Sequence, residues 1–318
     1  MRIARFTTTA SDSARVGLVL DEQLLDLSYL GYDDPVALLA LDARGRAELA
    51  ERARVDAARV DRSEARLLAP IARPPKFFGV GFNYRTHVEE LGGEVDREDM
   101  RRLAQVGDAM RAGFPSSRFV TVFNKQSSCV VGPDDDVWMP YDADWVDFEG
   151  EVAVVIGRRA RRLSPADAAQ VVAGYLLCND VSVREWQFES PTIWLGKSFE
   201  THGPLGPWIT TADEIADLDA VEIRTWVNDE ERQRGNLGEL VTPIPEIVSQ
   251  LSHVCTLEPG DVIATGSPAG VGISDGRYLK VGDTVRIEAA ELGVLRNTVV
   301  AEPGAPASAG RDVDRSAA

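Results

Sequence analysis

The chain has 318 residues, of which 34 are basic and 51 are acidic, and its formal net charge is −17 at pH 7. A hydrophobic fraction of 44% is ordinary for a folded globular protein, which excludes a wholly disordered chain and the collagen-like and coiled-coil classes. The acidic excess also argues against nucleic acid as a partner, because phosphate backbones are bound by clustered Lys and Arg.

Residues 1–70 are predicted to form a small N-terminal α+β domain. The apolar runs at 16–20 and 23–27 are typical of strands, and Asp34-Pro35 begins a helical stretch that continues to residue 41. A second helical pattern covers residues 46–58. Prolines within residues 71–75 can continue neither a helix nor a strand, so we predict a linker there.

Residues 76–301 are predicted to form a second, strand-rich domain. Its runs rich in Val and Ile predict strands at 77–81, 151–157, 221–228, 261–266 and 283–289. Ser164 is predicted to cap a helix over 165–173 that ends at Gly174, and Pro245 to begin another over 246–252. Pro259-Gly260 predicts a tight turn. Residues 302–318, rich in Ala, Pro, Gly and Ser, are expected to be a disordered tail.

The sequence shows no pattern typical of a membrane-spanning helix, a signal peptide or a disulfide framework. No apolar run reaches the roughly 18 residues of a spanning helix, and the first residues contain no apolar stretch typical of a signal peptide. We therefore expect a cytoplasmic protein without a membrane partner. Cys129, Cys178 and Cys255 are odd in number and far apart, so we expect small buried apolar residues rather than disulfides or a thiolate metal site.

Three carboxylates are candidates for a metal site. Glu149 and Glu151 come at the start of an apolar run, and residues two apart on a strand share one face, so the two side chains should lie side by side. Asp180 follows a second apolar run, at 174–178. Carboxylates at strand ends suit a hard, oxygen-seeking cation. The two glutamates alone would also fit a solvated strand edge.

His87 and Glu90 are candidates for an acid/base pair. A spacing of three places them on one side of a helical turn, where the carboxylate could orient the imidazole and raise its basicity, as a general base requires. A weak ion pair on a surface turn is the alternative.

Arg184, Gln187 and Lys197 follow the third carboxylate in the sequence. A guanidinium suits a carboxylate or an oxyanion, whereas a lysine supplies a compact charge. Only four of the 34 basic residues are lysines. Because this chain otherwise uses Arg, a functional role for Lys197 is favoured over an ordinary surface lysine.

Six segments together resemble the fumarylacetoacetate hydrolase superfamily over about residues 74–300. In chain order they are KFFGVGFNYRTHVEELG, VDFEGEVAVVIG, VAGYLLCNDVSVREWQ, LGKSFETHGPLGPW, TLEPGDVIATGSPAGVG and YLKVGDTVRIEAAELGVLRN. The resemblance implies an α+β, predominantly β fold: a mixed β-sandwich roll at 76–301 preceded by the small N-terminal domain. It also implies a homodimer that acts on a small-molecule 2-oxo or β-diketo acid.

The resemblance further implies a role for each candidate residue. Mg2+, or Mn2+ or Ca2+ in its place, would be held by Glu149, Glu151 and Asp180. The catalytic residues would be His87 and Glu90, carried on a lid, together with Lys197. The substrate would be contacted by Arg184, Gln187, Thr201, His202, Thr265, Gly266 and Ser267.

Some positions depart from the family pattern. Ser267 stands where Thr is usual but keeps a hydroxyl, Leu237 replaces a common Thr, and Asp229 replaces a Gly in a hairpin. His202 stands where an apolar residue is common and could face the substrate. Residues 93–115 form a charged extension, which we expect to belong with His87 and Glu90 to a mobile lid.

The leading expectation is hydrolytic cleavage of a carbon–carbon bond in an acylpyruvate-like or β-diketo acid. A decarboxylase, isomerase or hydratase acting on a 2-oxo acid at the same metal site is the first alternative. A non-catalytic 2-oxo acid-binding protein is the second, and the intact set of carboxylates, His–Glu pair and lysine argues against it.

Overall fold

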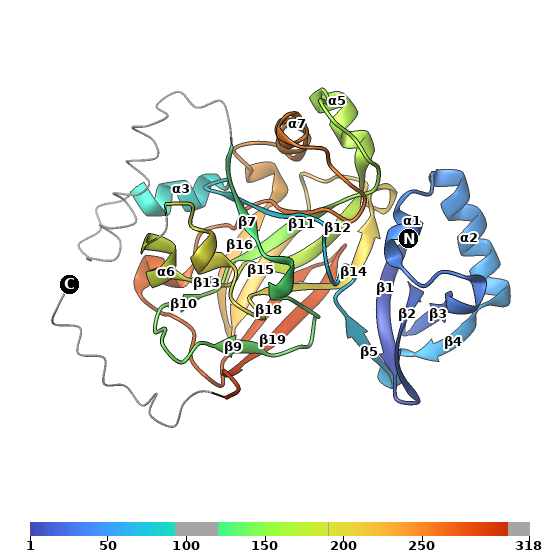
Figure 1. The fold of residues 1–318 in the computed structure, drawn as a ribbon, viewed down its shortest axis with the longest axis horizontal. Helices are drawn as coiled ribbons and strands as arrows, with labels where there is room; N and C mark the ends of the chain where they lie inside the picture. Colours follow the sequence, from blue (N-terminus) through green and yellow to red (C-terminus); the bar gives the residue numbers. More distant parts are fainter. Residues whose placement is uncertain (93–119, 190, 305–318) are drawn as a thin grey trace.

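The computed structural model describes residues 1–92, 120–189 and 191–304 (Figure 1). The extension predicted at 93–115 lies outside the described residues, as do residues 305–318 of the predicted tail. Within the described part, no helix is both long and apolar enough to cross a bilayer.

The N-terminal segment is a meander of strands covered by two helices. Both predicted strands and both predicted helices are present. Asp34 caps the first helix, where its Oδ1 accepts the N–H of Val36 at 2.9 Å, and Pro35 occupies the first turn. The elements are β1 (Arg2–Thr8), β2 (Ser11–Leu20), β3 (Gln23–Asp26), α1 (Pro35–Leu39), α2 (Ala43–Asp56), β4 (Ala58–Asp61) and β5 (Ala65–Leu68).

The described residues between 71 and 304 contain the remaining strands and helices of the described part. The strands are β6 (Phe77–Gly81), β7 (Thr121–Lys125), β8 (Val130–Val131), β9 (Val137–Met139), β10 (Val146–Asp147), β11 (Gly150–Ile156), β12 (Val172–Asn179), β13 (Ser182–Val183), β14 (Gly203–Thr211), β15 (Glu222–Val227), β16 (Glu230–Asn236), β17 (Val262–Ala264), β18 (Thr284–Ala289) and β19 (Gly293–Ala301). The helices are α3 (Arg85–Gly92), α5 (Pro165–Ala168), α6 (Arg184–Glu189), α7 (Ile244–Val254) and α8 (Gly272–Asp275), with short 3-10 turns that include η4 (Ala169–Val171) and η5 (Trp194–Lys197).

The N-terminal segment shares a sheet with the rest of the chain. β1 pairs antiparallel with β14, so that Ile3 lies opposite Ile209. The resulting sheet has 12 strands, and its main path runs β4-β3-β2-β1-β14-β12-β11-β17-β6-β7. Figure 1 shows the N-terminal strands and helices, in blue, continuing outward beside β14.

A second sheet of five strands, ordered β16-β15-β18-β19-β9, packs on the large one. The alternation of side chains along β11 explains its continuous apolar run. Val152 and Val154 pack in the core that includes Ile287 of the second sheet, whereas Ala153 and Val155 pack in the core shared with the N-terminal segment. The fold is therefore a predominantly β, α+β sandwich, as predicted.

The helix predicted over 165–173 ends two residues early. Ser164 caps α5 as expected, the 3-10 turn η4 continues from α5 to Val171, and β12 begins at Val172. Gly174 lies inside β12, and a Cβ atom there would stand 2.2 Å from the carbonyl oxygen of Thr210. The glycine thus permits close approach of β14 rather than ending a helix. The second predicted helix is present as α7.

Candidate metal centre and its surroundings

The pairing of β11 with β12 brings the three predicted metal ligands together. Gly150 pairs with Asn179, so the start of β11 lies beside the end of β12. The N–H of Asp180 donates to the carbonyl of Glu149 at 2.9 Å, which fixes the two residues against each other. Carboxylate oxygens of Glu149, Glu151 and Asp180 all lie within 4.8 Å of one another, and all three residues are buried.

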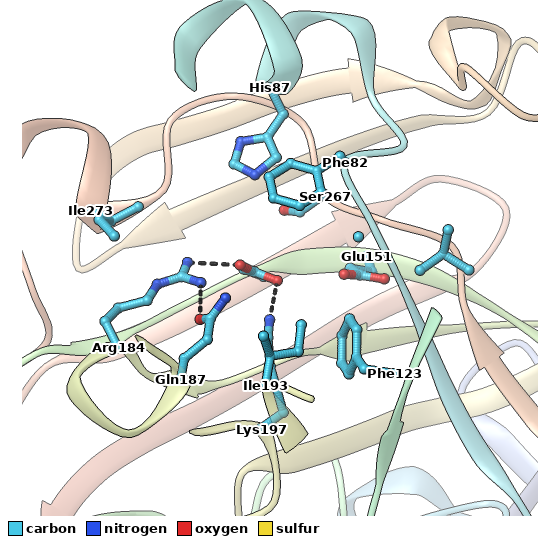
Figure 2. Close-up of a pocket in the computed structure, with 13 residues that line it drawn as sticks. Phe82, His87, Phe123, Glu151, Arg184, Gln187, Ile193, Lys197, Ser267 and Ile273 are labelled. Carbon is cyan, nitrogen blue, oxygen red and sulfur yellow. Dashed lines mark hydrogen bonds and ion pairs between the residues drawn. The ribbon is translucent and has the colours of Figure 1, made fainter. Parts of the chain in front are cut away.

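Glu149 is neutralised by two buried cations. Lys197 Nζ donates to Glu149 Oε2 at 2.6 Å and to Asp180 Oδ2 at 2.7 Å. Arg184 Nη2 donates to Glu149 Oε1 at 2.7 Å (Figure 2). Burial acts to raise the pKa of Glu149, but the charges of Lys197 and Arg184 outweigh it and lower that pKa far below its ordinary value. Glu149 is therefore an ionised carboxylate.

Glu151 has a different electrostatic environment. Its Oε2 accepts the N–H of Gly266 at 2.7 Å. Burial, followed by the negative charges of Asp180 and Glu149, raises the pKa of Glu151 well above its ordinary value. A cation placed among the three carboxylates would favour the ionised form of Glu151.

The charge balance of the whole cluster supports this fit. Four buried carboxylates meet three buried cations, which leaves one surplus negative charge when all four are ionised. The carboxylates are Asp147, Glu149, Glu151 and Asp180, and the cations are Lys125, Arg184 and Lys197. An oxygen-only donor set with surplus negative charge suits Mg2+, Mn2+ or Ca2+.

The loop Thr265-Gly266-Ser267 lies on one side of the site and is hydrogen-bonded to β11. Thr265 Oγ1 donates to the carbonyl of Val152 at 2.8 Å, and Ser267 Oγ donates to that of Gly150 at 3.0 Å. Gly266 has φ +106°, and a Cβ there would lie 2.9 Å from the Cβ of Asn83, so the position requires glycine. Ser267 lines the cavity described below, whereas Thr265 serves the attachment to β11.

His87 and Glu90 lie on α3, on the other side of the carboxylates. His87 Nδ1 is 3.3 Å from Glu90 Oε2, and Glu90 Oε1 accepts the N–H of Gly270 at 3.0 Å. Burial acts to raise the pKa of Glu90, but hydrogen bonds from His87 and Ser274 outweigh it and lower the pKa. An ionised Glu90 favours a hydrogen on Nδ1, which leaves Nε2 of His87 to accept a proton.

Several of these side chains line one cavity of about 40 Å³, enough for a few water-sized atoms, whereas Asp180 and Glu90 bond to its lining residues without lining it themselves. Figure 2 shows His87 above the carboxylates, Arg184 and Gln187 to one side, and Lys197 below. The lining residues are Val80, Gly81, Phe82, His87, Phe123, Glu149, Glu151, Arg184, Gln187, Ile193, Lys197, Ser267 and Ile273.

The structure does not bring Thr201 and His202 to this cavity. Thr201 Oγ1 accepts the N–H of Trp138 at 2.7 Å, and His202 Nε2 donates to the carbonyl of Trp138 at 2.8 Å. Burial lowers the pKa of His202 to about 3, so its ring is neutral. Both side chains bond to β9, and their contact with a substrate stays a prediction.

Two residues of the site were not singled out from the sequence. Lys125 Nζ donates to Asp180 Oδ1 at 2.6 Å and also to the carbonyl of Lys197. Asp147 Oδ2 accepts from Arg184 Nε and Nη2, at 2.9 and 2.7 Å. The scarcity of lysine that marked Lys197 marks Lys125 equally and could have revealed it.

Lys197→Arg is expected to lower kcat/KM by about 100-fold, the order of effect of losing one positioned donor. The reason is spatial: Lys197 Nζ sits between Glu149 and Asp180 and 4.9 Å from the centre of the Phe123 ring, and a planar guanidinium is too large for that position. Steady-state kinetics on a metal-loaded sample provide the measurement. The matched control is Lys280→Arg on the exposed surface. Equal activity in the two variants would contradict a role for Lys197.

Comparison with known proteins shows that this chain is similar to enzymes. A family profile described as fumarylacetoacetate (FAA) hydrolase C-terminal matches residues 76–300. The chain is 34% identical over 308 residues to a mitochondrial oxaloacetate tautomerase of Rattus norvegicus, covering 94% of this chain and 92% of that protein.

Two solved structures are similar over almost the whole chain. Maleylpyruvate hydrolase from Sphingobium sp. SYK-6, in complex with manganese(II) and pyruvate, has a TM-score of 0.74 and 30% identity, covering 95% of this chain and 99% of that one. Fumarylacetoacetate hydrolase from Exiguobacterium antarcticum has a TM-score of 0.77 and 31% identity, covering 95% of this chain and 100% of that one.

Proposed function

The chain belongs to the fumarylacetoacetate hydrolase family, and on that premise we propose that it is a divalent-metal-dependent enzyme that hydrolyses a carbon–carbon bond in an acylpyruvate-like or β-diketo acid. The observation that carries the proposal is a single cavity with an acidic cluster on one side and the His87–Glu90 pair on the other. Hydrolysis of such acids needs both a site for a hard cation and a base for water.

The proposed metal ligands are Glu149, Glu151 and Asp180. A divalent cation held there would act as a Lewis acid toward the carboxylate and the adjacent oxygen of a 2-oxo acid. Arg184 keeps Glu149 ionised and in place, through its contacts with Glu149 and Asp147. The ligand set is therefore supported by side chains that are themselves buried and hydrogen-bonded.

His87 is the proposed base. Its Nε2 takes a proton from water, and the hydroxide attacks the distal carbonyl of the substrate. Lys197 and Gln187 would then stabilise the oxyanion. Gln187 Oε1 accepts from Arg184 Nη1 at 2.8 Å, which leaves its amide N–H groups to donate into the cavity. Cleavage releases an acid and the enolate of pyruvate, which regains the proton from His87.

A second candidate is keto–enol tautomerisation of a 2-oxo acid at the same site. The specific observation in its favour is the 34% identity to an oxaloacetate tautomerase. This reaction needs His87 only to move a proton between carbon and solvent, with no attack by water. Decarboxylation, isomerisation or hydration would begin from the same enolate.

Product analysis separates these functions. Acetylpyruvate and oxaloacetate should each be incubated with Mg2+, Mn2+ or Ca2+, and with EDTA as the metal-free control. Hydrolysis predicts metal-dependent formation of acetate and pyruvate from acetylpyruvate. Tautomerisation predicts faster loss of enol absorbance with the carbon skeleton intact. Tight binding of a 2-oxo acid without turnover would contradict both and support the non-catalytic alternative.

We further propose that the enzyme works as a homodimer. The homodimer is supported by the resemblance to the family. Light scattering of the purified protein tests it, and a monomer would contradict it.

A further inference from the structure

Two residues that line the cavity have an unusual backbone conformation. Phe82 has φ +57° and Ile193 has φ +55°, in the left-handed region that favours glycine. A β-branched residue such as Ile193 is especially unfavourable there. Strain of this kind persists where the surrounding structure enforces it and is concentrated at functional sites. Both positions therefore hold a bulky apolar side chain at the cavity in spite of the backbone cost.

The two residues lie on opposite sides of the carboxylates. Phe82 follows β6, and its ring is nearly parallel to that of His87, with the centroids 6.4 Å apart. It also packs against the small cluster that contains Ile273. Ile193 comes directly before η5, which carries Lys197. Figure 2 shows Phe82 next to His87 and Ile193 next to Lys197. A ligand between them would meet apolar surface from both sides.

The cations of the cavity are already paired. Arg184 and Lys197 are the Lys and Arg residues that line it within the described part of the chain, and each pairs with two buried carboxylates. Neither of them is left to pair with a second carboxylate of a substrate, which would have to be desolvated beside the acidic cluster.

We propose that Phe82 and Ile193 are specificity-determining residues, which select 2-oxo acids with an uncharged, apolar distal end over those that carry a second carboxylate there. The inference rests on the proposed function, because it concerns the ligand of the same metal site. It goes further by naming the chemistry of the distal end and the two residues that recognise it.

Binding of two isosteric ligands tests the selection directly. 2-Oxopentanoate and 2-oxoglutarate have chains of equal length, and they differ in whether the last carbon is a methyl or a carboxylate group. Calorimetry on the Mn2+-loaded wild-type protein should give a Kd for 2-oxopentanoate at least about tenfold lower. Equal affinities, or tighter binding of 2-oxoglutarate, would overturn the proposal. Failure of both to bind would instead contradict the proposed function.

Ile193→Gly tests whether the side chain makes the selection. Glycine accepts the left-handed backbone, so the variant should fold, and the preference for 2-oxopentanoate should fall about tenfold. If Ile193 had a merely structural role, the variant would bind both ligands more weakly by the same factor, and the ratio of the two affinities would stay unchanged. That result would also overturn the proposal. Arg162→Gly is the matched control, since Arg162 has φ +54° on the exposed surface, and the preference should stay at the wild-type value.

If Ile193→Gly fails to fold, Phe82→Leu provides the same readout. Leucine keeps an apolar side chain but loses the flat ring, so the ratio of the two affinities should shift by less than in Ile193→Gly while still falling. An unchanged ratio in a folded Phe82→Leu protein would remove Phe82 from the selecting pair.

Discussion

Glu151→Gln is expected to lower kcat/KM by at least about 100-fold and to abolish tight binding of the metal. Loss of a residue that only supports a ligand costs about 10- to 100-fold in metal affinity or activity, so loss of a ligand should reach or exceed the upper value. Titration calorimetry with Mn2+ measures the affinity, and steady-state kinetics measure the activity. Undiminished affinity and activity would contradict the assigned metal site.

The same variant makes a prediction about stability without metal. The pKa of Glu151 is raised in the folded state, so the folded protein binds this proton more tightly than the unfolded chain does. The free energy of unfolding should therefore fall as the pH rises above the ordinary range of a glutamic acid. Glu151→Gln removes this loss and should be at least as stable as the wild type at pH 7 in EDTA. Glu48→Gln, on the exposed face of α2, is the control and should leave the pH dependence unchanged.

His87→Asn is expected to lower kcat by about 100- to 10,000-fold, the usual contribution of a positioned base. Because His87 contacts Glu90 rather than the three carboxylates, the affinity for Mn2+ should stay within about twofold of the wild type. Single-turnover kinetics and calorimetry on the same preparation measure the two quantities. A large loss of metal affinity with little change in kcat would mean that His87 supports the acidic cluster instead of acting as a base.

Two further variants complete this test. Glu90→Gln keeps the shape of the pair but removes the charge that orients the imidazole, so it should lower kcat by less than His87→Asn does. His253→Asn is the control for the loss of a histidine outside the site. His253 lies near the end of α7, and its ring bonds to the carbonyl of Ser249. That variant should keep the kcat of the wild type.

Much of the fold could be predicted because strands buried on both faces are written as continuous apolar runs. The run predicted at 77–81 is β6, and the run at 151–157 is β11 apart from one residue at each end. The predicted end of the helix at Gly174 was wrong because a glycine after a helical run can end the helix or permit close packing. The partner that decides between these, Thr210 on β14, is remote in sequence.

The metal ligands of the candidate site could be predicted because they lie at the ends of strands. Glu149, Glu151 and Asp180 come together because β11 and β12 are neighbours, which two adjacent apolar runs indicate. Thr201 and His202 could not be placed, because their hydrogen bonds go to Trp138 on a strand far earlier in the chain.

Phe82 and Ile193 could not be singled out from the sequence. By residue type they are ordinary apolar residues, and only their backbone angles in the folded chain distinguish them from residues of the core. The roles of these residues therefore depend on the conformation rather than on residue type.

The lysines also provide a chemical probe of the folded protein. Lys76, Lys125 and Lys197 each pair with a buried carboxylate, whereas Lys280 is exposed. An acylating reagent should therefore modify Lys280 quickly and Lys197 only when its ammonium leaves the carboxylates and loses a proton. The acylation rate of Lys197, followed by mass spectrometry with Lys280 as the internal standard, would thus report how often the native site opens, without substrate or an engineered label.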